Sequence, residues 1–262
     1  MQLHLIHVLA VAGLLTACTS EDPVPAKTVQ TFCAAKAAAE CQVAARCGTD
    51  VTACSTQRQT LCETAAADAA SFGRVFSATQ SEACVAKVKA LYVKVTPITP
   101  TELAAVADAC ERVMAGTVKA LEACPAGTYQ CSGKLICDKG FCGTPTAKAS
   151  GQPCANPGDI CGAAFHCAAN ASGLPICQAN VVKGQPCSAT AQANGPGPCL
   201  STLRCDTTST CTDRIASGGD CTPGADECVA TAPYCHPTLK KCTAGITYSA
   251  METEACKPFS GS

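Results

Sequence analysis

The apolar positions of the N-terminal half recur at helical spacing. Residues 29–47 are rich in alanine and place Cys33, Ala37 and Cys41 four positions apart, with Gly48 directly after the segment. Positions three and four apart share one face of a helix, and glycine suits the position that follows a helix end. The segment therefore predicts a helix that carries cysteine and alanine on its inner face.

Three more helices are expected before Gly116. Residues 50–71 carry two cysteines eight positions apart, close to one helix face. Thr-Gln-Ser-Glu at 79–82 and Thr-Pro-Thr-Glu at 99–102 have the form of capping boxes, the second with proline in the first turn, so each predicts a helix start. The third helix is expected to end before Pro97 and the fourth near Gly116. The helical domain is thus expected to span 29–123.

Large apolar side chains become scarce beyond residue 123. In 124–262, only 20 of 139 residues are Val, Ile, Leu, Met, Phe or Tyr, while 17 are cysteine. That cysteine content exceeds the roughly 8–10% that marks a disulfide scaffold. So few large side chains cannot form a conventional core, so disulfides are expected to stabilise this half in its place. Disulfides persist in oxidising compartments, so the protein is expected to be exported to one.

The cysteines of this second half repeat with a nearly constant period. All but the last fall into four groups of four, and the first cysteines of successive groups are 30, 33 and 34 residues apart, which is typical of tandem repeats. Aligned on cysteines, the four modules are 124–142, 154–177, 187–211 and 221–242. The last three open with Gly-x-x-Cys, which indicates a turn entering each module. With linkers such as 143–151 between modules, the array is expected to be elongated.

One apolar residue usually precedes the third cysteine of each module. These residues are Leu135, Phe165, Leu203 and the offset Tyr234. Each is expected to be the small apolar plug of its crosslinked module. The fold class predicted is therefore small and disulfide-rich, with an N-terminal alanine-rich helical domain followed by tandem four-cysteine modules of little regular structure.

An apolar segment precedes both regions. Residues 3–17 contain no Asp, Glu, Lys or Arg and end in Leu-Thr-Ala before Cys18. This run resembles a bacterial lipobox, in which cleavage makes the cysteine the new N-terminus and its thiol is acylated. The segment is too short to span a bilayer. We expect a lipoprotein signal peptide at 1–17, a lipid anchor at Cys18 and a tether at 18–28. Thr19, where Asp would retain the protein at the inner membrane, favours the outer membrane or cell surface.

Setting Cys18 aside leaves 24 of the 25 cysteines, an even number, for disulfides. They are Cys33, Cys41, Cys47, Cys54, Cys62, Cys84 and Cys110 in the helical domain; Cys124, Cys131, Cys137, Cys142, Cys154, Cys161, Cys167, Cys177, Cys187, Cys199, Cys205, Cys211, Cys221, Cys228, Cys235 and Cys242 in the modules; and Cys256 in the tail, 243–262. The seven cysteines of the helical domain become an even number if Cys256 of the tail forms a disulfide with one of them. Alternatively, Cys110 pairs with Cys124 and the tail bonds within the last module. Each module allows three pairings, of which we prefer first-to-third with second-to-fourth.

The cysteine pattern resembles a known family. Phe32-Cys33, Arg46-Cys47-Gly48, Cys84 and Cys110, followed by Gly-x-x-Cys openings and Cys-x3-Leu/Phe-x-Cys centres, are similar to the cysteine-rich lipoproteins abundant in myxobacteria. The repeats of that family are commonly matched to the Dickkopf N-terminal cysteine-rich domain. The resemblance covers most of the chain after Cys18 and implies architecture and surface location, with no particular activity.

No catalytic or metal-binding pattern stands out. The tightest cysteine spacing is Cys137-x4-Cys142, wider than the Cys-x2-Cys pairs of zinc sites, so neither a metal nor a cofactor is expected. His166 and His236, the histidines after residue 17, each adjoin a cysteine and are expected in loops with structural roles. Patterns of serine hydrolases, zinc proteases and P-loops are absent from the sequence, so no enzyme is expected. A net charge of −1 argues against nucleic acid as a partner.

Together these features predict a non-enzymatic, lipid-anchored protein of the cell envelope or surface that acts as a structural or protein-interaction module. Its partners would be the membrane, through the anchor, and an unidentified extracellular protein or glycan. The alternative is a disulfide-knot protein that inhibits an extracellular protease or binds a glycan or other ligand, with the loop 188–198 as one contact.

Overall fold

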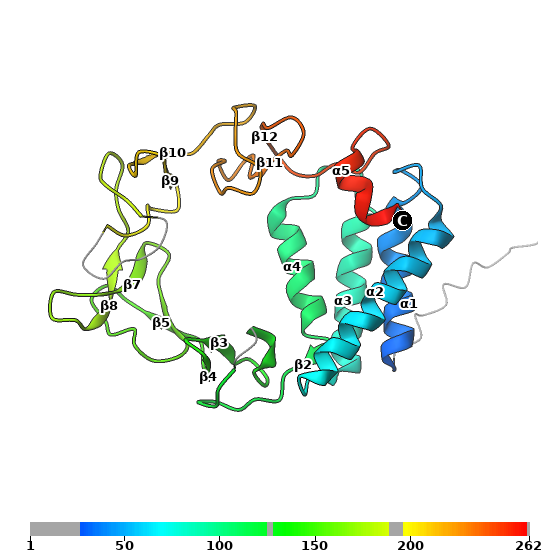
Figure 1. The fold of residues 1–262 in the computed structure, drawn as a ribbon, viewed down its shortest axis with the longest axis horizontal. Helices are drawn as coiled ribbons and strands as arrows, with labels where there is room; N and C mark the ends of the chain where they lie inside the picture. Colours follow the sequence, from blue (N-terminus) through cyan, green and yellow to red (C-terminus); the bar gives the residue numbers. More distant parts are fainter. Residues whose placement is uncertain (1–26, 125–127, 189–195, 261–262) are drawn as a thin grey trace, which may run out of the picture.

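The computed structural model describes residues 27–124, 128–188 and 196–260. Within these ranges the protein is small and cysteine-rich, with most of its helices in the N-terminal part and most of its short two-stranded sheets after them (Figure 1). The predicted signal peptide 1–17, the lipidation site Cys18 and most of the tether lie outside the described residues. None of the helices in those ranges is both long enough and apolar enough to cross a membrane.

Four helices make up the N-terminal part, which confirms the predicted helical region. They are α1 (Val29–Glu40), α2 (Val51–Ser71), α3 (Ala78–Tyr92) and α4 (Pro100–Glu111), with a 3-10 turn η1 (Cys41–Val43) after α1. α4 begins as predicted, because the Thr99 hydroxyl accepts a hydrogen bond from the N–H of Glu102 while the Glu102 carboxylate accepts one from the N–H of Thr99.

Three predicted helix boundaries are wrong. The first helix ends at Glu40 and continues as η1 and turns, up to Gly48 with its positive φ of 69°. α3 is capped by Ser77, whose hydroxyl accepts from the N–H of Gln80, so it begins before the predicted box at 79–82. α4 ends at Glu111 because β2 (Met114–Ala115) leaves the helix to pair with β1 (Val75–Phe76).

The helical core consists largely of cysteine and β-branched side chains. α1 packs on α2 and α3, and α3 packs on α4. Val43, Val88 and Val113 are fully buried between them. Three disulfides cross this core: Cys33–Cys62, Cys41–Cys54 and Cys84–Cys110. Because alanine faces bury little apolar area, these crosslinks supply stability that larger side chains would otherwise give.

The second half consists of short paired strands. They are β3 (Ile136–Asp138) with β4 (Phe141–Gly143), β5 (Thr146–Lys148) with β6 (Asp159–Cys161), β7 (Phe165–Ala169) with β8 (Pro175–Ala179), β9 (Leu203–Cys205) with β10 (Cys211–Asp213), and β11 (Tyr234–Cys235) with β12 (Cys242–Thr243). A 3-10 turn, η2 (Thr128–Gln130), precedes β3, and α5 (Thr253–Cys256) and η3 (Lys257–Phe259) end the chain. β5 and β6 are parallel, and the other pairs are antiparallel.

The strand pairs follow one another along an arc that returns to the helices. In Figure 1 the chain leaves the helices at β2, passes through β3 to β12, and comes back to them with α5. The modules were expected to form an elongated array, and the strand pairs of this part of the chain curve back toward the helices. Both of its ends meet the same group of helices.

Candidate functional site

Each group of four cysteines has the same disulfide order. The first cysteine bonds to the third and the second to the fourth, which is the order preferred from the sequence. The pairs are Cys124–Cys137 with Cys131–Cys142, Cys154–Cys167 with Cys161–Cys177, Cys187–Cys205 with Cys199–Cys211, and Cys221–Cys235 with Cys228–Cys242. We call these four groups the cysteine quartets.

A hairpin carries the third and fourth cysteines of each quartet. The third and fourth cysteines face each other across an antiparallel strand pair, as Cys137 and Cys142 do in β3 and β4. The same register holds in β7–β8, β9–β10 and β11–β12. Each hairpin cysteine bonds outward to one of the two earlier cysteines, so two disulfides pin the preceding loop onto the hairpin.

The backbone around each quartet repeats as well. The N–H three residues before the first cysteine donates to the carbonyl of the fourth: Leu121 to Cys142 at 2.7 Å, and Gly151 to Cys177, Gly184 to Cys211 and Gly218 to Cys242 at 2.8 Å. These four residues have a positive φ, which explains the glycines of the Gly-x-x-Cys openings. Leu121, at φ 68°, adopts the same conformation with a side chain that disfavours it.

A further contact extends each quartet six residues toward the N-terminus. In each case that residue pairs in parallel with the second cysteine: Val118 with Cys131, Lys148 with Cys161, Val181 with Cys199 and Ile215 with Cys228. The repeated contacts thus begin before the predicted module starts, and part of the predicted linker 143–151 belongs to the next quartet.

The chain beyond the last quartet uses the corresponding position to contact the helical part. Ile246 follows Cys242 by four residues, as Val181 follows Cys177 and Ile215 follows Cys211. Its partner is Ile98, and each N–H donates to the carbonyl of the other at 2.8 Å. A side chain at the neighbouring Gly245 would place its Cβ 2.2 Å from the Ile98 oxygen, so glycine is required for this approach.

An aromatic cluster and a disulfide hold the C-terminal segment on the helices. The ring centroid of Phe259 lies 5.6 Å from that of Tyr92 and 5.4 Å from that of Tyr248. Arg58 lies over the same Phe259 ring, 5.7 Å from its centroid. Cys256 bonds to Cys47, one of the two arrangements expected from parity. The other arrangement, with Cys110 bonded to Cys124, does not occur in the structure because Cys110 pairs with Cys84.

A buried ion pair supports this contact. Glu40 is 4% exposed and accepts from Lys36 Nζ at 2.6 Å and Arg58 Nε at 2.8 Å. Burial by itself raises the pKa of Glu40, but the hydrogen bonds and charges of Arg58 and Lys36 outweigh it and leave that pKa below its usual value. The carboxylate therefore stays ionised and orients Arg58 toward Phe259.

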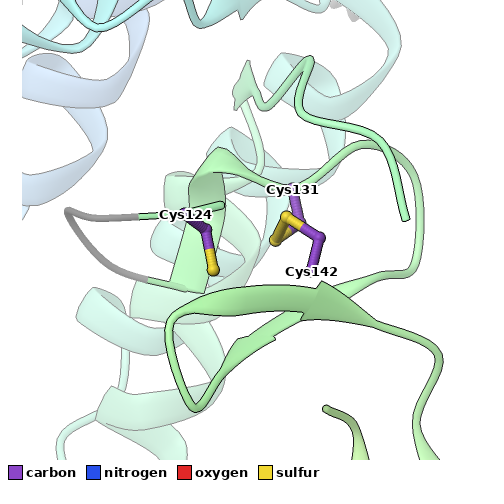
Figure 2. A group of neighbouring side chains, drawn as sticks. All are labelled: Cys124, Cys131 and Cys142. Atoms are coloured by element: carbon purple, nitrogen blue, oxygen red, sulfur yellow. A yellow bond between two sulfur atoms is a disulfide. The ribbon is translucent and has the colours of Figure 1, made fainter. Parts of the chain in front are cut away.

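The sulfur atoms gather into groups that resemble metal sites in distance alone. Cys124, Cys131 and Cys142 have sulfurs within 4.8 Å of one another, and Figure 2 shows the Cys131–Cys142 disulfide beside Cys124. Similar triads occur in the other quartets. Because zinc is bound by thiolates and each of these sulfurs is in a disulfide, the triads are crosslinks in this oxidation state.

The two histidines have structural contacts. His236 Nδ1 accepts from the N–H of Thr238 and Leu239, at 3.3 and 3.2 Å, so the neutral ring carries its proton on Nε2, 2.8 Å from Glu252. His166 Nδ1 lies 3.1 Å from Asn180 Oδ1. His236 follows β11 in a loop as predicted, whereas His166 is in β7, so its predicted loop position is wrong.

The predicted plug residues are only half-buried. Leu135, Phe165, Leu203 and Tyr234 each retain intermediate exposure. In the last quartet Ala232, at 1% exposure, takes the inner position in place of Tyr234. The offset of Tyr234 from the other plug residues is the sequence signal for this difference.

A cleft of about 650 Å³ lies where the helices meet the first quartet. Its polar lining consists of Ser77, Gln80, Asp108, Arg112, Tyr129 and Lys134. The sequence singled out none of them, because they come from three separate segments and follow no motif.

Comparison with protein-family models, with curated proteins and with solved structures found no match to this chain.

Proposed function

We propose that this protein is a lipid-anchored, non-enzymatic protein of the cell envelope whose four cysteine quartets act as tandem modules of an interaction scaffold. The observation that carries the proposal is the repetition of one disulfide order and one set of backbone hydrogen bonds in four successive quartets. Repeats that share such contacts present a regular surface, and such surfaces commonly bind other macromolecules.

The attachment of both ends to the helices supports a scaffold role. At the entry, Gly116 approaches the backbone of Gln130 so closely that a Cβ would lie 2.2 Å from its carbonyl. At the exit, the Ile98–Ile246 contact and the Cys47–Cys256 disulfide return the chain to the same helices. Constraint at both ends limits the orientations of the quartets, which lowers the entropy lost when they bind a partner.

The disulfides indicate an extracellular or surface location. Twelve disulfides join all the cysteines of the described ranges, and such density is stable where thiols are oxidised. The lipobox-like run ending at Cys18 supports attachment to the outer membrane or cell surface. An acylated cysteine would keep the protein on the membrane without a spanning helix.

Three features support the absence of an enzymatic role. The described cysteines are in disulfides and so offer no thiolate nucleophile. His236 uses both ring nitrogens in structural hydrogen bonds. His166 Nδ1 lies 3.1 Å from Asn180 Oδ1, so its ring also has a structural contact.

Anchoring is tested by expressing the full chain in a Gram-negative host with an alkyne-labelled fatty acid, and by separating membranes from the soluble periplasm. The wild type and a Ser20→Ala control are expected to be labelled and membrane-bound. Cys18→Ala is expected to be unlabelled and soluble, with its twelve disulfides intact. An unlabelled wild type would refute the lipid anchor.

The scaffold role is tested by retention of envelope components on immobilised Cys18→Ala protein, compared with the same protein after reduction and alkylation. A component retained only by the oxidised protein supports binding by the folded quartets. Equal retention by both forms, or retention by neither, would reject the interaction role.

A further inference from the structure

The cleft between the helices and the first quartet has a built polar lining. α3 contributes Gln80, α4 contributes Asp108, and the turn after α4 contributes Arg112. Tyr129 and Lys134 come from the first quartet. A volume of about 650 Å³ is in the range of small-molecule sites. The cleft is also partly apolar, because Met114, Leu135 and Ile136 line it as well.

A bidentate ion pair lies on the helical wall of the cleft. Arg112 Nε and Nη2 donate to the two Asp108 oxygens at 2.9 and 2.8 Å. The hydrogen bonds from Arg112 hold the pKa of Asp108 below its usual value, so its carboxylate is ionised across the physiological range. The Tyr129 hydroxyl lies 3.5 Å from the same carboxylate. The Arg112 and Asp108 side chains are 44% and 48% exposed, so the pair presents its charges to the solvent in the cleft.

The remaining charge of the cleft is positive. The bidentate pair neutralises Asp108 but leaves Nη1 of Arg112 without a hydrogen-bond partner among the described residues. Lys134 is exposed and has no ion pair within the described parts of the chain. A Cβ added at Gly133, the cleft residue next to Lys134 in the sequence, would meet no atom within 4 Å, so the space beside the Gly133 backbone is open.

From this lining we infer that the cleft binds an acidic sugar unit through its carboxylate. The Lys134 ammonium group and the Nη1 group of Arg112 would donate charge-assisted hydrogen bonds to the carboxylate. Ser77 and Gln80 offer hydroxyl and amide groups to sugar hydroxyls, while Met114 and Leu135 offer apolar surface to the C–H face of the ring. The inference deepens the proposed interaction role and rests on the protein being exposed to extracellular or envelope polysaccharide.

The test is calorimetric titration of purified, oxidised Cys18→Ala protein with trigalacturonate, with maltotriose as the neutral trisaccharide and succinate as a carboxylate without a sugar. Trigalacturonate is expected to bind, and the other two are expected to bind at least roughly tenfold more weakly. Amide resonances of Gly116 and Gly133 should shift on binding, and those of Gly184 and Gly218 should not.

Variants link the binding to the cleft. Lys134→Ala is expected to weaken trigalacturonate binding by roughly tenfold or more, because it removes a charge-assisted hydrogen bond. Gln80→Ala should weaken trigalacturonate binding without changing that of succinate. Lys89→Ala, an exposed lysine near the end of α3 and outside the cleft, is the matched control and should bind as the wild type does.

Three outcomes would overturn the inference: no binding of trigalacturonate, equal binding of succinate, or equal effects of Lys134→Ala and Lys89→Ala. These outcomes are independent of the scaffold proposal, which depends on retention of envelope components by the quartets. A protein that retains a partner but does not bind trigalacturonate would lose this inference and keep its proposed function.

Discussion

Removal of the Cys47–Cys256 disulfide is expected to destabilise the protein more than removal of a local one. Its cysteines are 209 residues apart, whereas Cys41 and Cys54 are 13 apart. In the chain-entropy model, the disulfide that closes the longer loop contributes about 5 kcal/mol to the free energy of unfolding, and the one that closes the shorter loop contributes about 3 kcal/mol. Other disulfides shorten the long loop, but halving it removes only about 0.6 kcal/mol because the dependence is logarithmic.

Replacement of both members of each pair by alanine gives a matched comparison. The four cysteines are all buried, so both double variants lose similar apolar contacts and differ mainly in loop length. We expect Cys47→Ala/Cys256→Ala to lose about 2 kcal/mol more than Cys41→Ala/Cys54→Ala. Chemical unfolding without reductant, followed by circular dichroism of the helices, measures the difference.

The reasoning would be refuted if the local pair proved equally or more important. Such a result would mean either that the C-terminal segment stays near the helical part in the unfolded state, or that non-covalent contacts such as those of Phe259 attach it more strongly than the disulfide does. Hydrogen exchange of residues 244–260 distinguishes the two, because the second case leaves these amides protected in the double variant.

Three further substitutions test the backbone conformation of the quartets and the cap of α4. Leu121→Gly is expected to raise the free energy of unfolding by about 0.5 kcal/mol, because relief of the left-handed conformation exceeds the added freedom of the unfolded chain. Gly184→Ala should lower the free energy of unfolding by about 1–2 kcal/mol. If both substitutions shifted the thermal unfolding midpoint in the same direction, this argument would be contradicted. Hydrogen bonds from Lys94, and then from Thr99, lower the pKa of Glu102 to about 2. Since that pKa lies below the unfolded value, the stability it contributes is complete above about pH 5 and is lost as the pH falls toward 2. Glu102→Gln should flatten this part of the pH dependence of the melting temperature, and an unchanged profile would show that other carboxylates cause it.

Local signals predict the helices well where a cap and a face agree. Thr99 with Glu102 marks the start of α4 in both sequence and structure. The box at 79–82 predicts the start of α3 two residues late because Ser77 also caps, and no local feature distinguishes it from Thr79. The end of α4 depends on the pairing of β1 with β2, which are about 40 residues apart in the sequence. The local pattern of apolar positions cannot predict such a non-local contact.

The cleft residues cannot be found by the same means. Asp108 and Arg112 are four residues apart on an ordinary helical repeat, where an ion pair is common at a solvated surface. They line a cleft only because Gly116 lets the first quartet pack against the end of the helices. No motif joins these residues with Lys134, so sequence inspection cannot group them.

The sequence by itself determined that the protein has a helical part and a second part without enough large side chains for a core, so that cysteines must crosslink it. Those properties depend on local spacing and composition. Only the tertiary structure decided that Cys47 is the partner of Cys256 and that Ile246 contacts Ile98. The physical reason is that many pairings satisfy the same cysteine count, and the choice among them depends on which distant segments the folded backbone brings within bonding distance.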